Sequence, residues 1–419
     1  MLKGARLLAT ILLMVCCAAC GNKATTATVT TYSNYSSVST TGGAFAIGGA
    51  IQGTPLPLAA KGINATAVST LAGIPGSAGA VDAGGASAAA TSFNIVNGIT
   101  TDGANLYIAD FGNHTIRKYS FSDQTTTTIA GVAGVAGSSD TAFATGSAAA
   151  VAATFNGPSG ITTDGNGNLY VTDYNNSTIR RIYMRSDGSA TVTTIAGLAG
   201  TVGSVDDTLI GGVNARFNHP TDITTDGVHL YVTDSNNLTI RKINILPPYG
   251  VTTVAGSPGN GGAADGVGAN ARFKYPARIT TDGSYLYVTD FINNTIRRIE
   301  PLTGMVTTIV GSPGQTGSNP AGAAVLGQNA RFSNINGITT DGTNLYVTDS
   351  NNHTIRQISL TAPYTVTTIA GSPGVPGTNA AGATVSGADA RFKFPVGITT
   401  DGTSLYVTDS NNYTIRKIQ

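Results

Sequence analysis

The chain has 419 residues, of which 11% are charged, and its formal net charge at pH 7 is +1. A charge this close to zero argues against the basic face that a nucleic-acid backbone requires, so we expect no nucleic-acid partner. The chain has 54 glycines and no tryptophan, and its many Thr and Val residues alternate with Gly, Asn and Asp. This composition is typical of β-strands joined by tight turns. A chain of this length is too long for one ordinary compact domain unless that domain is built from repeats.

Residues 1–19 have the pattern of an export signal. Lys3 and Arg6 give a positive start, and residues 7–15 form an uncharged apolar run. The run is too short to span a bilayer as a helix, but it is typical of a secretory signal peptide.

The signal ends in Cys17-Ala18-Ala19-Cys20, which resembles the lipobox of bacterial lipoproteins, with Cys17 at a position that is usually leucine. The resemblance implies that Cys20 is lipidated and becomes the mature N-terminus, so the membrane is a partner through a lipid anchor. The alternative is an ordinary cleaved signal peptide. The expected location is the extracytoplasmic side of the bacterial envelope, and Gly21 favours the outer membrane.

All three cysteines, Cys16, Cys17 and Cys20, lie in this N-terminal segment, so the sequence that follows offers no disulfide or Cys-ligated zinc. Residues 20–64 are rich in Ser, Thr and Gly, and we interpret them as a lipidated tether.

Residues 65–419 contain a unit that recurs six times, every 56–62 residues. Each copy has a phenylalanine, an aspartate in a Thr-Asp-Gly turn nine residues later, a second aspartate, and an arginine seven residues after that. The second aspartates and the arginines are Asp110, Asp173, Asp234, Asp290, Asp349 and Asp409, with Arg117, Arg180, Arg241, Arg297, Arg356 and Arg416.

Every unit predicts four strands, a to d. Strand a ends in Ile-Thr-Thr, and an Asp-Gly turn joins it to strand b, Leu-Tyr-Val-Thr-Asp, whose alternation predicts a half-buried strand. An Asn-rich turn follows, and we expect its Asn residues to adopt the positive φ that such turns need. Strand c is Thr-Ile-Arg-x-Ile and strand d is Val-Thr-Thr-Ile-Ala-Gly. Six antiparallel units of this kind predict an all-β, six-bladed β-propeller of four-stranded blades.

The two ends of the repeat region predict how the ring closes. The last unit stops after strand c, and a lone strand d, residues 67–73, precedes the first unit. We therefore expect residues 67–71 to pair antiparallel with residues 414–418, which closes the ring and removes its open edges.

The pattern Pro395-Val396-Gly397-Ile398, Leu405 to Asp409 and Asn411 to Ile418 resembles the NHL-repeat propeller family. The Asn-His pairs at Asn113-His114 and Asn352-His353 support the resemblance. The family includes protein-binding and RNA-binding modules, extracellular sensors and a few enzymes, so the resemblance leaves the function open.

Groups present once in every blade are most simply structural, so the repeated aspartates and arginines predict no catalytic site. We expect the second Asp to accept backbone N–H bonds in the b–c turn and to pair with the Arg on strand c, and such a pair contributes about 0–1 kcal/mol if it is exposed. The four histidines and Glu300 are not placed to converge. We therefore expect no metal, no cofactor and no catalytic residue.

The informative positions are those that break the repeat. Where four blades have Gly before Ile-Thr-Thr, the third and fourth blades have Asp222 and Arg278, which we expect to pair at the mouth of the central channel. The alternative is a structural ion pair without a ligand. The loops from strand d to the next strand a are long, as in residues 256–273, and loops of this length are often functional. They share a face with the b–c turns, and the alternative is that they only pack between blades. The candidate ligand-binding residues on that face are Asp222, Arg278, His219, Tyr275, Phe394, Tyr174 and Tyr413.

From the sequence we expect a monomeric, envelope-anchored, non-catalytic binding or scaffold propeller. It would recognise a protein or another extracytoplasmic ligand through the face of the d–a loops and b–c turns. The alternative is an extracytoplasmic hydrolase or lyase with its site at the channel mouth, near Asp222 and Arg278.

Overall fold

The computed structural model divides the chain into two compact units, Met1–Gly53 and Thr54–Gln419. In the first unit, β1 (Val38–Thr41) pairs antiparallel with β2 (Ala44–Ile47). The predicted signal and Cys20 lie outside the described residues. Within the described part of the chain, no helix is long and apolar enough to cross a membrane. The structure describes residues 38–41, 44–47, 63, 67–83, 90–141, 152–185, 190–208, 211–319, 324–380 and 383–419.

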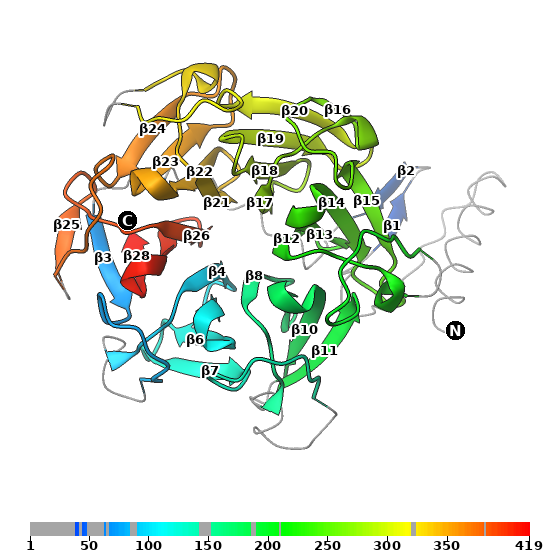
Figure 1. Cartoon of the computed structure of the whole chain (residues 1–419), viewed down its shortest axis with the longest axis horizontal. Helices are drawn as coiled ribbons and strands as arrows, with labels where there is room; N and C mark the ends of the chain where they lie inside the picture. The colour runs from blue at the N-terminus through cyan, green and yellow to red at the C-terminus, as the bar shows by residue number, and fades with distance from the viewer. Residues whose placement is uncertain are drawn as a thin grey trace. The chain divides into compact units, whose positions relative to one another are not determined.

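The second unit is the predicted propeller, with six antiparallel sheets arranged around a central axis (Figure 1). In each blade, strand a lies innermost and strand d outermost. Blades one to three contain β4 (Val96–Thr101), β5 (Asn105–Asp110), β6 (Thr115–Ser120), β7 (Thr126–Ala130); β8 (Pro158–Thr163), β9 (Asn168–Asp173), β10 (Thr178–Met184), β11 (Ala190–Ala196); and β12 (Pro220–Thr225), β13 (His229–Asp234), β14 (Thr239–Asn244), β15 (Val251–Gly256). Blades four to six contain β17 (Pro276–Thr281), β18 (Leu286–Asp290), β19 (Thr295–Glu300), β20 (Met305–Val310); β21 (Ile335–Thr340), β22 (Asn344–Asp349), β23 (Thr354–Ser359), β24 (Val366–Ala370); and β26 (Pro395–Thr400), β27 (Leu405–Asp409), β28 (Thr414–Ile418), β3 (Ala67–Ala72).

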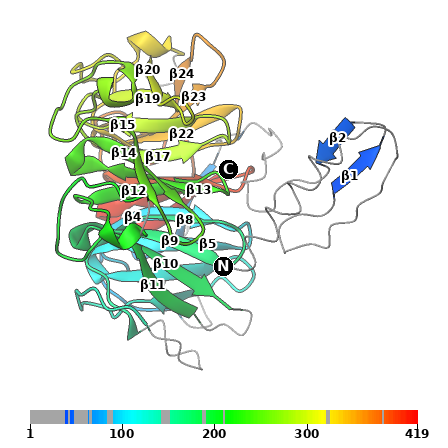
Figure 2. The same ribbon diagram turned by 90° about the vertical axis from the view of Figure 1, so that its right-hand side faces the viewer.

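The connections between strands gather on the two faces of the ring, and outer strands such as β7 and β20 lie across the view down the axis (Figure 1 and Figure 2). Strand b is buried at nearly every position, as in β27, where all five residues are buried. The expected half-buried alternation was therefore wrong. Both sides of a blade pack against neighbouring blades, so neither face of strand b is left for solvent.

The ring closes as the sequence predicts. Strand β3 pairs antiparallel with β28, and the register places Thr70 opposite Arg416 and Val68 opposite Ile418. The sixth blade is thus completed by a strand from the opposite end of the repeat region. The pairing leaves no gap in the ring of six blades, and it covers the edge of β28 that would otherwise be open.

The long d–a loops cover the outer edge of the blade that they enter. In blades four and six they form short fifth strands, β16 (Gly266–Val267) on β20 and β25 (Thr384–Ser386) on β3. In the other blades single bridges or hydrogen bonds take this place: Ala83 to Thr126, Thr141 to Val192, Asp207 to Val251 and Val325 to Val366. The d–a loops therefore pack against the blades, as the second of the two interpretations of these loops expects.

The repeated phenylalanine fills the space between neighbouring blades. Phe155, for example, is fully buried and packs with Ile116 and Ala130 of blade one and with Ile161 of blade two. The repeated arginine of the same blade lies over this ring, with the guanidinium carbon 4.9 Å from the ring centre for Arg180. The ring and the guanidinium thus form one stacked pair in each interblade core.

A buried ion network, here called the Asp–Arg clamp, holds each blade together, and blade three is representative. Arg241 is fully buried. Its Nη1 donates to Asp234 at 2.8 Å and its Nη2 donates to Asp206, on the incoming d–a loop, at 2.7 Å. The loop residue is Asp82, Asp140, Asp206 or Asp265 in blades one to four, and Asn319 or Asn379 in blades five and six.

The rest of the clamp also supplies donors to the buried carboxylate. Asp234 accepts the backbone N–H of Asn218, the residue after the repeated Phe, at 2.8 Å. Asn237 of the b–c turn donates to Asp234 at 2.7 Å and to the loop carbonyl of Gly203. Burial raises the pKa of Asp234 to about 6, and Arg241 with these donors opposes that rise, so the carboxyl is ionised at pH 7.

Two expectations about this turn are corrected, and the first concerns the donor to the aspartate. The backbone N–H comes from the d–a segment rather than from the b–c turn. Since the Asp–Arg pairs are buried, the value for an exposed pair does not apply to them. The positive φ falls on the residue after the Asn, such as Leu238 at +62°, because the Asn is needed as the donor to the clamp. Each b–c turn contains a short 3₁₀ helix: Phe111–Asn113, Tyr174–Asn176, Ser235–Asn237, Ser350–Asn352 or Ser410–Asn412, with a plain turn in blade four.

Replacing the clamp arginine should strongly destabilise the propeller. We expect Arg241→Met to lower the free energy of unfolding by about 3–5 kcal/mol, because Asp234 is left buried and charged without its partner. Urea unfolding of the chain without its signal measures this. Lys242→Met, one residue further on the same strand and half-buried, is the control, with an expected change within about 0.5 kcal/mol. Equal losses for the two variants would show that the clamp does not stabilise the fold.

Candidate functional site

A cavity of about 390 Å³ lies at the hub of the ring, where the starts of strands a meet the b–c turns. The innermost ring of its wall takes one residue from each blade. These residues are Asn97, Ser159, Thr221, Ala277, Asn336 and Val396. They precede by one residue the position that the sequence analysis singled out, and sequence reasoning missed them. The sequence feature that could have identified them is that they vary from blade to blade, whereas the residues on either side are nearly constant.

In four of the six blades the ring residue is followed by a glycine, which the packing between blades requires. A Cβ on Gly337 would overlap the carbonyl oxygen of Val396 in the next blade, and one on Gly397 would overlap the carbonyl oxygen of Asn97. Blades three and four have side chains at this position, and the hub loses its sixfold symmetry there.

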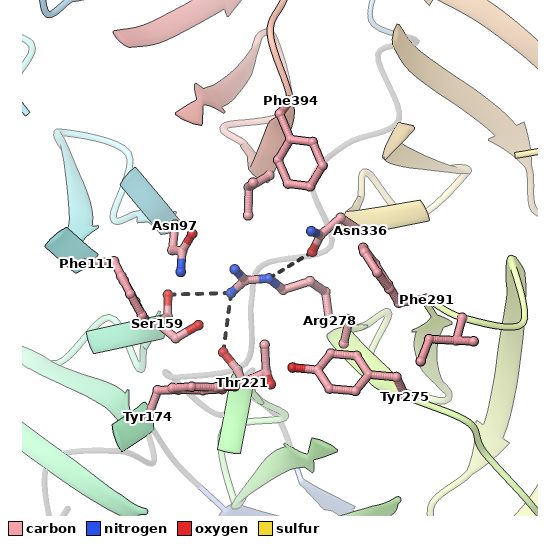
Figure 3. A pocket seen from close by; sticks show the side chains of 13 residues that line it. Asn97, Phe111, Ser159, Tyr174, Thr221, Tyr275, Arg278, Phe291, Asn336 and Phe394 are labelled. Atoms are coloured by element: carbon pink, nitrogen blue, oxygen red, sulfur yellow. Dashed lines mark hydrogen bonds between the residues drawn. The ribbon is translucent and has the colours of Figure 1, made fainter. Parts of the chain in front are cut away.

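Arg278 extends from blade four across the hub (Figure 3). Its side chain is buried, with 3% of the residue exposed. Nε donates to Asn336 Oδ1 at 3.3 Å, and Nη1 donates to the carbonyl oxygens of Ser159 at 3.4 Å and Thr221 at 3.3 Å. The one residue thus contacts blades two, three and five, and it forms part of the cavity wall.

Asp222 pairs with Arg278 as predicted, but loosely. The distance from Asp222 Oδ1 to Arg278 Nη1 is 3.6 Å. The other oxygen accepts the backbone N–H of Ile279 at 3.0 Å. Burial raises the pKa of Asp222, and Arg278 opposes that rise. Asp222 is not part of the cavity wall, so its influence on the charge of the cavity comes through its pair with Arg278.

Aromatic side chains surround the ring residues on the outer side of the cavity. Phe111, Tyr174 and Phe291 come from b–c turns, and Tyr275 and Phe394 come from the ends of d–a loops. Tyr174 and Phe111 lie edge to face with ring centres 6.0 Å apart, as do Tyr275 and Phe291 at 5.9 Å. Burial and the neighbouring phenol of Tyr275 raise the pKa of Tyr174, so the Tyr174 phenol is neutral at pH 7.

The other candidate residues lie outside the cavity wall. His219 packs against Tyr174, with ring centres 4.7 Å apart, and its Nδ1 lies 2.8 Å from Asn218 Oδ1. Tyr413 follows the b–c turn of blade six with φ of +59°. The structure therefore brings Arg278, Tyr174, Tyr275 and Phe394 together, places Asp222 and His219 behind them, and leaves Tyr413 apart.

The backbone at Tyr275 differs from that of the matching residues in the other five blades. In four interfaces, the residue with positive φ after the b–c turn accepts the N–H of a d–a residue in the next blade. The pairs are His114 with Gly157, Ser177 with His219, Asn294 with Asn334, and His353 with Phe394. Leu238 has no acceptor, so the N–H of Tyr275 donates to Asp290 of its own blade at 3.0 Å. Tyr275 lacks the positive φ found at Ile95, Gly157, His219, Asn334 and Phe394.

Two of the four histidines therefore have a structural use. His114 and His353 accept backbone N–H groups through Nδ1, which requires that nitrogen to be unprotonated. Among the residues that the structure describes, no group of three or more His, Cys, Asp or Glu side chains is placed to hold a metal ion.

The link at His353 predicts a loss of stability in acid. Burial lowers the pKa of His353 below 6.5, so the unfolded chain takes up the proton more readily than the folded one. The contribution of His353 is therefore complete above pH 6.5 and is lost as pH falls through the lower pKa of the folded state.

His353→Asn isolates this effect, because Asn294 makes the same link in blade four without titrating. We expect equal unfolding free energies for the two proteins at pH 7.5 and a smaller loss for the variant at pH 5, measured by urea unfolding. Parallel pH profiles for the two proteins would contradict the assignment.

Comparison with known proteins agrees with this architecture. The family model for the NHL repeat matches residues 155–182. NHL repeat-containing protein 2 of Bos taurus is 27% identical over 291 residues, and the human protein is 26% identical over 300 residues. Each match covers 64% of this chain and 39% of the relative, so the chain spans about two fifths of these curated relatives.

Solved structures share the fold at low sequence identity. A protein of unknown function from Bacteroides thetaiotaomicron superimposes with a TM-score of 0.60 at 20% identity, covering 84% of this chain and 75% of the other. An auxiliary nutrient binding protein from the same organism gives 0.60 at 16% identity, covering 84% and 76%. The fold and repeats define a six-bladed propeller. The chain matches the NHL repeat at residues 155–182, and its propeller is similar to those of NHL-repeat proteins.

Proposed function

We propose that this protein is an envelope-anchored, non-catalytic binding propeller that takes its ligand at the hub cavity, on the face of the b–c turns. The observation that carries the proposal is the contrast between the symmetric blades and the asymmetric hub. Within the part of the chain described, the six blades repeat nearly the same buried contacts, whereas the cavity wall differs from blade to blade.

The distribution of charge supports binding rather than catalysis. Twelve aspartates are the two repeated ones of each blade, and four more hold the clamp arginines from the d–a loops, so sixteen of the 22 acidic residues have structural partners. The aspartates of the a–b turns, for example, accept backbone N–H groups of their own turn. A general acid or base at the cavity would need a titratable side chain such as Asp, Glu or His in its wall, and the described lining residues include none of these three.

The shape of the hub supports a compact ligand. A volume of about 390 Å³ lies in the usual range for small-molecule sites, and the wall combines aromatic surface with a few polar groups. Because the d–a loops are bonded to the outer blade edges, the ligand-binding face that we propose is smaller than the whole face of d–a loops and b–c turns expected from the sequence. It consists of the cavity and its aromatic rim.

The proposed location rests on the N-terminal sequence and on the use of this fold elsewhere. Residues 1–20 have the pattern of a lipoprotein signal. Among the solved structures with the same fold are auxiliary nutrient binding proteins of Bacteroides, so the fold serves binding in other bacterial proteins, which supports a binding role at the envelope here.

Replacing Cys20 tests the anchor. We expect the wild-type chain expressed in a Gram-negative host to be recovered in the membrane fraction and to incorporate labelled palmitate. Cys20→Ala should do neither, because the thioether can no longer form. Cys16→Ala, which changes a cysteine inside the signal, is the control and should behave as wild type. Label on the Cys20→Ala chain, or membrane recovery without label, would contradict lipidation at Cys20.

A thermal-shift experiment tests the binding function. We expect the low-molecular-mass fraction of envelope extract to raise the Tm of the purified chain by about 2–5 °C when the ligand is about 100-fold above its Kd. Tyr174→Ala/Phe394→Ala should remove the rise, and Tyr183→Ala, an exposed tyrosine of an outer strand region, should keep it. Stoichiometric bound metal, or turnover of lactone and ester substrates that the hub variant loses, would favour the hydrolase or lyase alternative.

A further inference from the structure

Arg278 differs from the six clamp arginines in how its guanidinium is satisfied. The clamp arginines bond through both Nη atoms, as Arg241 does at 2.7 and 2.8 Å. Arg278 bonds only through Nε and Nη1, at 3.3–3.4 Å, and its Nη2 has no acceptor among the residues that the structure describes. In five of the clamp arginines the unpartnered nitrogen is instead Nε, which is buried. The unpartnered Nη2 of Arg278 belongs to a residue of the cavity wall, so its N–H groups are available to an acceptor in the cavity.

The groups around Nη2 are neutral. Among the described lining residues, Arg278 is the one charged side chain, and the amides of Asn97 and Asn336 and the hydroxyl of Ser159 stand beside it. Figure 3 shows the Asn97 amide directed toward the guanidinium, with Phe394 and Tyr275 on opposite sides of it. The cavity therefore presents one positive charge, extra amide donors and flat apolar walls.

Resting on the proposed function, we propose that the hub cavity binds a monoanionic carboxylate attached to a flat aromatic body. The carboxylate accepts hydrogen bonds from Nη2 of Arg278 and from the Asn97 amide. The aromatic body packs against Tyr174, Tyr275 and Phe394. Charge-assisted bonds from a guanidinium to a carboxylate are among the strongest hydrogen bonds in proteins, and a dry wall strengthens them.

The charge of the site favours a carboxylate over a phosphate. Asp222 lies 3.6 Å from Arg278 Nη1 and offsets part of the positive charge. The site therefore has at most the one positive charge of Arg278, which suits the single negative charge of a carboxylate better than the nearly two charges of a phosphate monoester. A free small acid and the C-terminus of a peptide offer the same group, so the experiment includes both sources.

Isothermal titration of the purified chain tests the ligand class directly. The probes are phenylacetate and indole-3-acetate as aromatic carboxylates, phenylacetamide as the neutral match, acetate as the carboxylate without a ring, and phenyl phosphate as the dianion. A peptide that ends in phenylalanine, with its C-terminal amide as a control, tests the second source. We expect at least one aromatic carboxylate to bind at least tenfold more tightly than its amide, acetate or phenyl phosphate.

The double variant Asp222→Gly/Arg278→Gly gives the sharpest comparison. It returns both positions to the residue that the other four blades carry, and it removes the two charges together. We expect it to fold, as judged by circular dichroism, and to lose at least tenfold in affinity for the carboxylate with little change for a neutral ligand. Arg278→Gln, which keeps a polar side chain, should show the same loss, and Arg298→Gln on strand β19 should bind as wild type.

The outcomes separate this inference from the proposed function. Binding of an extract ligand that depends on Tyr174 and Phe394 but not on Arg278 would overturn the carboxylate assignment and leave the binding function intact. Equal affinity for a carboxylate and its amide would do the same. If neither extract nor probes change the Tm or give heat of binding, both proposals fail.

Discussion

The structure depends on the buried Asp–Arg clamp. Each clamp joins strand b, strand c, the b–c turn and the incoming d–a loop of a blade, and it stacks on the Phe that fills the space next to the preceding blade. Buried pairs of this kind add little net stability over apolar packing, but they cost several kcal/mol when one partner is removed. Their consequence here is geometric, because the contacts of one arginine fix strand b, the d–a loop and the phenylalanine relative to strand c.

This constraint explains the division between framework and hub. Because each blade repeats the same aspartates, arginine and phenylalanine, the repeat spacing predicts the blades, their order and the closing strand from the sequence alone. The six aromatic wedges follow from the same repeat. Positions that the clamp does not use are free to differ, and they are the positions that form the cavity.

The sequence analysis predicted less of the site, for physical reasons. It identified the Asp222–Arg278 pair and several rim aromatics, since those residues break the repeat. It missed Asn97 and Phe111, because which residue faces the hub depends on the bulge at the start of strand a. The expected share of the d–a loops in the ligand-binding face was too large. Their bonds to outer blade edges and to clamp arginines are made with residues distant in the chain, so the sequence did not reveal them. The buried state of the repeated ion pairs was also not visible in a pattern of charges.

The closing strand has a consequence for how the protein is made. Residues 67–72 leave the ribosome more than 340 residues before their partner, residues 414–418. During that interval the first strand has no neighbour on its inner side, and the last blade cannot form. Completion of the ring is therefore postponed until the far end of the repeat region arrives, and a chain interrupted in the final repeat would expose two unpaired strand edges to proteases and to other chains.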